Sequence, residues 1–175
     1  MRRRWLLLVA VTVGAVLVDQ VTKALVIAYL PLNAEWAPIP ALSHLFAITH
    51  TTNTGAVFGI FPDAGAVFLV IALVVVGLII YFYRSLPDGG WLIRVALGLQ
   101  LAGALGNFID RVRLGHVVDF IHVKFWPVFN VADSCIVIGV GVLVLALFLD
   151  ERRERRQPDD DPTPPDKQPS TPEIE

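Results

Sequence analysis

The sequence predicts an all-α membrane protein in which four transmembrane helices carry a small extracytoplasmic β-sheet. Three observations predict this fold class. The 175 residues are 55% hydrophobic and 17% charged, with a mean hydropathy of +0.63, which is too apolar for a water-soluble domain of this length. Four apolar stretches reach the length of roughly 20 residues that a helix needs to cross a bilayer. Two short segments between them are rich in β-branched and aromatic residues, which is typical of strands.

The clearest span runs from Gly65 to Tyr83 without one charged residue. Three further spans contain isolated polar residues: Trp5 to Leu30, Trp91 to Ile109 and Val131 to Leu149. The first of these also resembles the basic and apolar regions of a cleaved signal peptide. No small-residue cleavage site follows Val18 and the apolar pattern then resumes, so one long span is the better interpretation. Four spans place both termini on the same side.

The arginines indicate which side is cytoplasmic. They lie at one set of span ends, and the cytoplasmic flanks of transmembrane helices are enriched in Lys and Arg. These arginines are Arg2, Arg3, Arg4, Arg84, Arg94, Arg152, Arg153, Arg155 and Arg156. Both termini are therefore expected in the cytoplasm, and the segments 31–64 and 110–130 are expected outside. Within the outer segments, Leu45 to Thr49 and Val117 to Val123 read as strands.

The chain divides into a membrane domain, residues 1–150, and a polar remainder, residues 151–175. The remainder contains six prolines and many charges, which leaves little apolar area to bury, so a disordered cytoplasmic tail is expected there. The net charge of −2 and the segregation of the charges do not indicate nucleic-acid binding. The single cysteine, Cys135, lies in an apolar run and is interpreted as an inert core thiol.

Polar residues inside the spans need a reason, because a charge near the bilayer centre costs roughly 2.5–3.5 kcal/mol on insertion scales. The depth of these residues in the membrane suggests a reason. Asp19 follows Trp5 by a helical rise of about 21 Å, which places it in the outer half, and Lys23 lies one turn further out. The remaining polar residues stand at the outer ends of the third and fourth spans or in the link between them. They are Asn107, Asp110, Arg111, Asp119, Asn130 and Asp133.

Structural roles compete with functional ones at each position. Asp19 and Lys23 are spaced i,i+4 and could form only an ion pair. Asp110 and Arg111 could cap the third helix and reach the headgroups. Asp133 has no adjacent cation in the sequence, which favours a functional role.

Two other residue types were weighed. The four histidines, at 44, 50, 116 and 122, form no metal-ligand spacing, so no metal site is expected. Gly98, Gly103 and Gly106 are expected to permit close helix packing.

Carboxylates that converge on one layer predict aspartyl chemistry. Two adjacent aspartates cannot both ionise cheaply, so the pair holds a shared proton and can activate water for attack on an amide. The sequence has no GxSxG motif and no evident Ser/His or Cys/His arrangement. The residues alone do not decide whether Asp110 or Asp119 is the partner of Asp133.

Five blocks resemble the signatures of the lipoprotein signal peptidase (signal peptidase II) family, and they occur in order between Trp5 and Leu149. They are Asp-Gln-Val-Thr-Lys at 19–23, Asn-Thr-Gly-Ala-Val-Phe at 53–58, Gly-Ala-Leu-Gly-Asn-Phe-Ile-Asp-Arg at 103–111, Val-Val-Asp-Phe at 117–120 and Phe-Asn-Val-Ala-Asp at 129–133. One block alone would be weak, but five in order are highly specific.

The resemblance implies an aspartic endopeptidase of the bacterial inner membrane, with its site near the outer face. It would cleave prolipoproteins N-terminal to a diacylglyceryl-modified cysteine, and its partners would be these substrates and membrane lipid. No cofactor is implied. The implied catalytic residues are Asp119 and Asp133. The implied supporting residues are Asp19, Lys23, Asn53, Asn107, Asp110, Arg111 and Asn130.

Two other function classes stay open on the residues alone. A proton-coupled transporter would use Asp19, Asp110 and Asp133 as a relay, although only Gln100 could extend this path inward. A non-catalytic assembly factor would use the carboxylates only for ion pairs.

Overall fold

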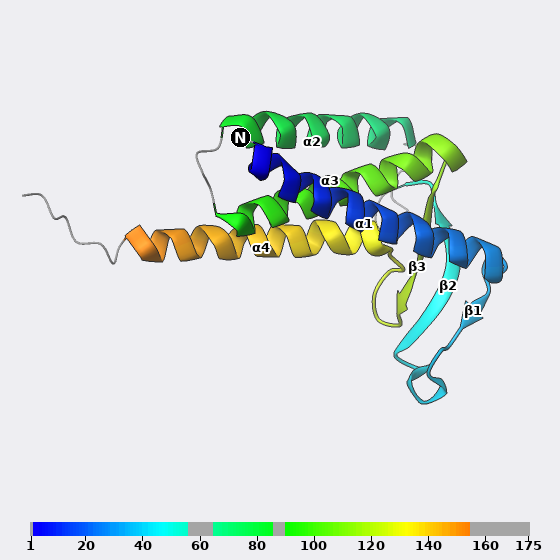
Figure 1. Ribbon diagram of the computed structural model, residues 1–175. Coiled ribbons are helices and arrows are strands. Elements are labelled where there is room, and N and C mark those ends of the chain that lie inside the picture. Colours follow the sequence, from blue (N-terminus) through cyan, green and yellow to red (C-terminus); the bar gives the residue numbers. More distant parts are fainter. Residues whose placement is uncertain (1, 56–64, 86–89, 155–175) are drawn as a thin grey trace, which may run out of the picture.

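The computed structural model describes residues 2–55, 65–85 and 90–154. Figure 1 shows long helices side by side with a sheet at one end of the bundle. The helices are α1 (Arg2–Tyr29), α2 (Gly65–Ser85), α3 (Trp91–Leu114) and α4 (Val131–Glu154). Each is long and apolar enough to cross a membrane. The predicted fold class is confirmed.

Three helices extend beyond their predicted C-terminal ends, α2 by two residues to Ser85 and α3 and α4 by five residues each. α3 continues five residues past Ile109 and ends before Gly115, whose φ of 79° lies in the left-handed region that a helix C-cap favours. Asp110 therefore lies inside α3, and the alternative that it caps this helix is wrong. α4 continues to Glu154, so the first four residues of the expected tail are helical. Residues 155–175 lie outside the described part of the chain.

The sheet has the order β1-β2-β3 and is antiparallel throughout. β3 (Val117–Val123) has its predicted bounds, and β2 (Phe46–Asn53) is longer at its C-terminal end than predicted. β1 (Glu35–Trp36) was not predicted. Between β1 and β2 lies one short 3-10 helix (Pro40–Leu42), and an irregularity in β2 separates the two halves of its register with β3.

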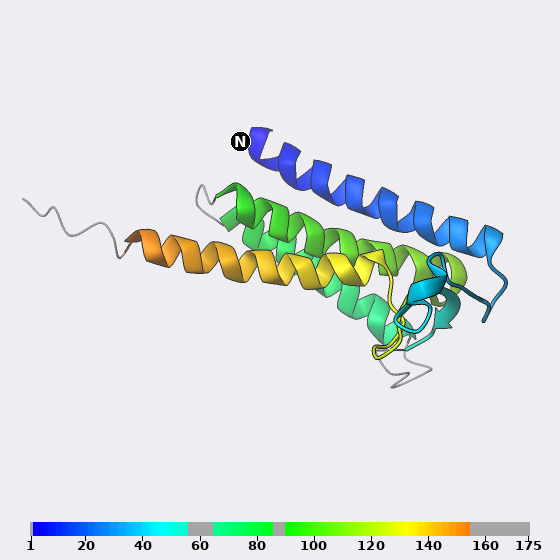
Figure 2. The same ribbon diagram turned by 90° about the horizontal axis from the view of Figure 1, so that it is seen from below.

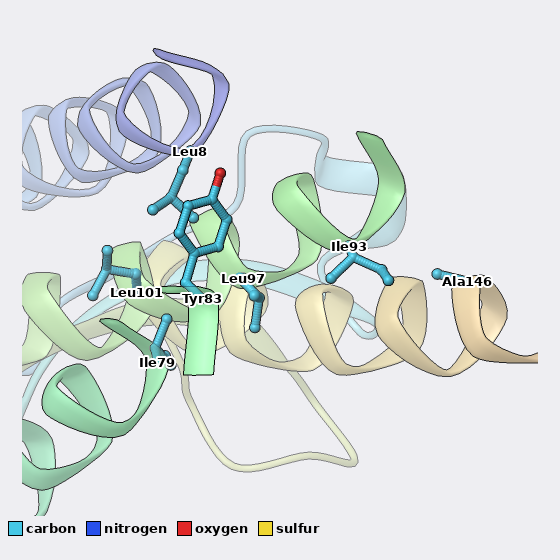
Figure 3. Packing of buried hydrophobic residues seen from close by; sticks show 7 residues of the cluster. All are labelled: Leu8, Ile79, Tyr83, Ile93, Leu97, Leu101 and Ala146. Atoms are coloured by element: carbon cyan, nitrogen blue, oxygen red, sulfur yellow. The ribbon is translucent and has the colours of Figure 1, made fainter. Parts of the chain in front are cut away.

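α3 is the central helix and packs against α1, α2 and α4. At the end away from the sheet, buried side chains from all four helices meet, as Figure 3 shows. Trp5 stacks edge-on against Tyr83, with ring centroids 4.7 Å apart. This apolar cluster consists of Leu8, Ile79, Tyr83, Ile93, Leu97, Leu101 and Ala146.

Glycines set the closest helix contacts, as predicted. A Cβ on Gly103 would lie 2.4 Å from the Ala132 carbonyl oxygen of α4, and one on Gly106 would lie 2.6 Å from the Asp19 carboxylate of α1. At Gly98 the nearest atoms belong to Val11, at 3.0 Å. α3 therefore approaches its neighbours closely at the level where the polar residues lie.

Candidate active site

The site begins at the first turn of α4, where Asn130 and Asp133 cap each other. The Asp133 N–H donates to Asn130 Oδ1 at 2.9 Å, and the Asn130 N–H donates to Asp133 Oδ2 at 3.2 Å. This reciprocal pair is a capping box, which satisfies two backbone donors that a helix start leaves free. It fixes the Asp133 carboxylate at the sheet end of the bundle.

Asparagine side chains connect Asp133 to Asp119. Asn107 donates to Asp133 Oδ1 at 2.7 Å, while Asn130 donates both to Asn107 Oδ1 at 3.1 Å and to Asp119 Oδ1 at 2.7 Å. Asn53 donates to Asp119 Oδ2 at 3.1 Å. The donors come from β2, from α3 and from the residue before α4, so three segments far apart in the sequence hold one pair of aspartates.

Asp119 reaches this layer because the chain turns back after β3. Asp119 stands opposite Thr51 in the sheet and is 3% exposed. Beyond β3 the chain returns antiparallel to it, so that the Phe129 N–H donates to the Ile121 carbonyl at 3.1 Å and the Ile121 N–H donates back at 2.7 Å. This return places Asn130, and with it the start of α4, beside Asp119.

Both aspartates line one cavity of about 730 Å³. Its polar end also includes Asn53, Asn107 and Arg111. The other lining residues are mostly apolar and come from the segment after β2, from α2, from the start of β3, from the return segment and from the first turns of α4. They are Gly55, Phe68, Val117, Trp126, Pro127, Val128, Phe129, Ser134, Ile136, Val137 and Ile138. An apolar ligand with one polar group fits such a cavity.

Burial raises the pKa of the Asp119 carboxyl to about 6, and the negative charge of Asp133 acts in the same direction. Hydrogen bonds from Asn53 and Asn130 oppose this shift because they favour the charged form. The result is a carboxyl group that exchanges a proton close to neutral pH, as acid–base catalysis requires.

A second cluster lies behind the first and is centred on Lys23. Its ammonium group contacts the carboxylates of Asp19 at 2.9 Å and of Asp110 at 2.8 Å, and all three side chains are at most 3% exposed. Lys23 also donates to Asn107 Oδ1 at 3.2 Å. The predicted ion pair of Asp19 and Lys23 is present, and it belongs to a buried triad that connects with the aspartate pair through Asn107.

The carboxylates of the triad also accept hydrogen bonds from backbone N–H groups. Asp19 Oδ1 accepts the Ala132 N–H in the first turn of α4 at 2.9 Å, and Asp110 Oδ2 accepts the Val118 N–H of β3 at 3.2 Å. Ala132 and Val118 are each the residue directly before an aspartate of the cavity. The triad therefore positions both segments that carry the pair.

Gln20 joins this cluster and was missed by sequence reasoning. Its side-chain amide donates to Asp110 Oδ1 at 2.9 Å, and its oxygen accepts from Arg113 at 3.2 Å. The signal was available, since Gln20 directly follows Asp19 in the first block.

Arg111 supplies positive charge at the cavity wall. Its guanidinium lies over the Phe68 ring, 5.2 Å from the centroid, and donates to the Gly55 and Asn107 carbonyls at 3.4 Å each. Phe68 and Gly55 also escaped sequence reasoning as residues of the site.

All nine residues singled out in the sequence lie in these two connected clusters. They differ in what they face. Asp119 and Asp133 line the cavity, whereas the Asp110 carboxylate is occupied by Lys23, Gln20 and Val118 and does not line it.

Comparison with known proteins gives consistent results. The model of the family described as signal peptidase (SPase) II matches residues 11–149. The lipoprotein signal peptidase of Halothermothrix orenii is 41% identical over 138 residues, which cover 78% of this chain and 92% of the relative. That of Symbiobacterium thermophilum is 42% identical over 153 residues, covering 85% and 98%.

Two solved structures of bacterial membrane enzymes share the fold. One is 34% identical with a TM-score of 0.76 and covers 86% of this chain and 93% of its own. The other is 37% identical with a TM-score of 0.70, and the coverage is 82% and 93%.

Four membrane-length helices that hold two aspartates against one cavity agree with a membrane-embedded peptidase of the aspartic type, the class that the family model and the relatives indicate. Together with the match over residues 11–149 and the full-length relatives, this establishes that the chain belongs to the signal peptidase II family. The predicted family and lipoprotein signal peptidase activity are confirmed. Membership in an enzyme family also removes the transporter and the assembly factor as alternatives.

Proposed function

We propose that the chain cleaves prolipoproteins directly N-terminal to a cysteine that carries diacylglycerol, with Asp119 and Asp133 as the catalytic pair. One observation carries the assignment of the pair. Both carboxylates line the same cavity, and a continuous set of asparagine hydrogen bonds holds them. The apolar lining of the cavity suits a substrate with a lipid group.

The reaction uses one proton shared by the pair. The ionised aspartate takes a proton from a water molecule while the water oxygen attacks the carbonyl carbon of the scissile bond. The protonated aspartate donates to the carbonyl oxygen, which gives a neutral tetrahedral diol. The amide nitrogen then takes a proton from the pair, the C–N bond breaks, and the lipidated cysteine leaves as a free amine. One hydroxyl of the diol gives its proton to the ionised aspartate, so the signal peptide leaves with the new carboxyl group and the pair again holds one proton.

Arg111 and the triad have supporting roles in this proposal. Arg111 lines the cavity, where its charge stabilises an oxyanion or the ionised member of the pair. Lys23, Asp19 and Asp110 hold the peptide units that precede the two catalytic residues. Asp110 is left out of the catalytic pair because three contacts already use its carboxylate.

The same proposal includes the orientation in the inner membrane. The arginines at the end of the bundle away from the sheet support a cytoplasmic location for both termini, so the sheet and the site are outside. Reporter fusions after Glu151 test this point. An extracytoplasmic signal there would reverse the orientation.

The proposed reaction is tested with purified protein and a prolipoprotein whose cysteine carries diacylglycerol. The matched control is the same prolipoprotein with an unmodified cysteine. We expect a shortened product that begins with the lipidated cysteine, identified by mass spectrometry, and little product from the control. Equal cleavage of both forms would contradict the requirement for the lipid, and cleavage at another bond would contradict the assigned position.

A further inference from the structure

We propose that His50 is a positioning residue for the cleavage reaction: it fixes a bulge in β2 to the end of α1, and this bulge turns Asn53 toward Asp119. The inference rests on the proposed function, because it takes Asp119 as a member of the catalytic pair. His50 lies outside the five sequence blocks and does not line the cavity. Any effect of His50 on the reaction must therefore pass through another residue.

The bulge lies where β2 pairs with β3. Ile48 of β2 stands opposite Ile121 of β3, and the next pair joins Thr51 to Asp119. Between these two pairs β2 has two residues, of which His50 is the second, and β3 has one. Two residues opposite one is the pattern of a β-bulge, a feature that often re-aims a side chain next to an active site.

This extra residue decides which face of the sheet Asn53 occupies. Side chains of a regular strand alternate between two faces, so residues an odd number of positions apart point to opposite faces. Asn53 follows Ile48 by five positions. Their partners on β3, Val117 and Ile121, are four positions apart and share the face of Asp119. Without the bulge, Asn53 would be turned away from Asp119.

Asn53 uses its orientation to hold Asp119. Its Nδ2 donates to Asp119 Oδ2 at 3.1 Å, and its Oδ1 accepts the Gly55 N–H at 3.0 Å. The second hydrogen bond fixes which end of the amide faces the aspartate. Loss of this arrangement would change both the position of the Asp119 carboxylate and its affinity for a proton.

Three hydrogen bonds fix His50 to the segment that follows α1. Its ring Nδ1 lies 2.8 Å from the Leu30 carbonyl oxygen, and since a carbonyl can only accept, Nδ1 carries the proton. The His50 N–H donates to the Ala34 carbonyl at 3.1 Å, and the His50 carbonyl accepts the Asn33 N–H at 2.7 Å. The bulged residue is thus held by its side chain and by both of its backbone groups.

The end of α1 is a rigid anchor for this contact. The last carbonyls of a helix have no partner within the helix, and the Leu30 carbonyl directly follows α1. Figure 2 shows the end of α1 and the sheet together at one end of the bundle. His50 is 9% exposed, so the contact is largely shielded from water. α1 also carries Asp19 and Lys23, and the same helix therefore positions the triad and the bulge.

The test is a double-mutant cycle between His50 and Asn53 in the full chain, with a prolipoprotein whose cysteine carries diacylglycerol as substrate. His50→Ala and Asn53→Ala should each lower kcat by about ten- to hundredfold, since a misplacement of about 1 Å can cost about 10²-fold. The double variant should be no slower than the slower single variant, because both changes remove the same contact with Asp119. Rates are compared at equal amounts of folded protein.

Conservative variants identify the atom that matters. Asparagine at this position carries an amide N–H near the place of Nδ1, so His50→Asn should restore most of the rate. Glutamine carries its amide near the place of Nε2, so His50→Gln should be as slow as His50→Ala. If His50→Ala does not fold, His50→Gln takes its place in the cycle.

His122 provides the matched control within the sheet. It contacts Thr49 at 3.1 Å and Glu35 at 3.3 Å and makes no contact with the end of α1. His122→Ala should therefore leave kcat unchanged. A loss equal to that of His50→Ala would show that the sheet responds to any histidine removal and would overturn the specific role of His50.

Three further outcomes would overturn the inference: a normal kcat in His50→Ala, losses that simply multiply in the double variant, or a His50→Asn variant as slow as His50→Ala. Asp119→Asn is measured beside them. If it is inactive, these outcomes reject the role of His50 and leave the catalytic pair in place. Full activity of Asp119→Asn would reject the pair itself, and the inference about His50 with it.

Discussion

Asn130 and Asp133 exchange hydrogen bonds at the start of α4, at 2.9 and 3.2 Å, and each also contacts a residue of the aspartate network. Helix capping and the hydrogen-bond network of the two aspartates therefore use the same two side chains. The Asp133 carboxylate caps the start of α4, and this capping contact restricts the rotamers of the Asp133 side chain.

Substitutions of Asn130 separate these two roles. Serine caps a helix well but is too short to donate to Asp119, so Asn130→Ser should keep most of the thermal stability and lose most of the activity. Asn130→Ala should lose activity and, in addition, about 1 kcal/mol of stability through the missing cap. Thermal unfolding and cleavage rates at matched protein levels check both. Full activity in Asn130→Ser would show that the contact with Asp119 is dispensable.

The proposed catalytic pair, Asp119 and Asp133, predicts a specific pattern of lost activity. Asp119→Asn and Asp133→Asn should each lower cleavage by at least about 10³-fold, because asparagine cannot exchange the proton that activates water. The double variant should be no worse than either single variant, since the two groups act as a unit.

Asp110→Asn is the internal control for the pair. It should retain measurable product, with a loss within about tenfold, or 1.4 kcal/mol, because the proposed role of Asp110 is support. An inactive Asp110→Asn beside a near-normal Asp119→Asn would reverse the assignment.

The pH dependence follows from the pKa of Asp119, which burial raises from 3.8 to about 6. Because the folded state binds the proton more tightly, Asp119 contributes stability that is fully present below pH 3.8 and is lost as the pH rises through about 6. The loss amounts to at most about 3 kcal/mol. Asp119→Asn should remove this part of the pH dependence of the unfolding midpoint.

Activity should fall on the alkaline side for the same reason. A pair that has lost its shared proton cannot protonate the carbonyl oxygen, so kcat/KM should decrease above the apparent pKa values of the pair. A rate that stays level into the alkaline range would be inconsistent with a shared proton.

Lys23 neutralises two buried carboxylates, so its removal should be costly. Lys23→Ala leaves Asp19 and Asp110 without their cation and should destabilise the protein by about 3–5 kcal/mol. Addition of Asp110→Asn should restore part of this stability, because one uncompensated charge is removed. Thermal unfolding in detergent measures both. Unchanged stability with no turnover would instead place Lys23 among the catalytic residues.

Gly103 lies at the closest contact between α3 and α4. In Gly103→Ala the new Cβ would meet the Ala132 carbonyl oxygen at 2.4 Å, and backbone shifts of this kind cost about 1–3 kcal/mol. Gly141→Ala is the matched control within α4, where nothing lies within 4 Å, and alanine there should be neutral or stabilising. Equal unfolding midpoints for the two variants would contradict the role of the close contact.

The sequence predicted most of the fold because lipid imposes strong constraints on it. Long apolar runs and clustered arginines are direct signals of spans and their ends. Bounds were less certain where polar residues continue a helix. α3 extends through Asp110 and Arg111 to Leu114, because Asp110 is buried against Lys23 and Arg111 is half-buried at the cavity wall. The strand Glu35–Trp36 has only two residues, which is too short to show alternation.

The site was predictable as a group of residues, but not in its internal arrangement. Spacing brings Asp110 and Asp119 to one layer, yet the choice between them depends on which carboxylate Lys23 occupies. That contact joins α1 to α3, and no local sequence pattern predicts a contact between residues so far apart in the chain. The spacing of Asn130 and Asp133, by contrast, is that of a capping box, and it agrees with the start of α4 at Val131, which the apolar span had already predicted.

The spacing of Gly103, Gly106, Asn107 and Asp110 has a consequence for how such chains can diverge. At 3.6 residues per turn these positions share one side of α3, so close packing and the polar contacts depend on the same helical phase. Inserting or deleting one residue inside this block would rotate everything beyond it by about 100° and would disrupt both together. Changes of length are therefore expected outside the block, for example in the return between Val123 and Asn130.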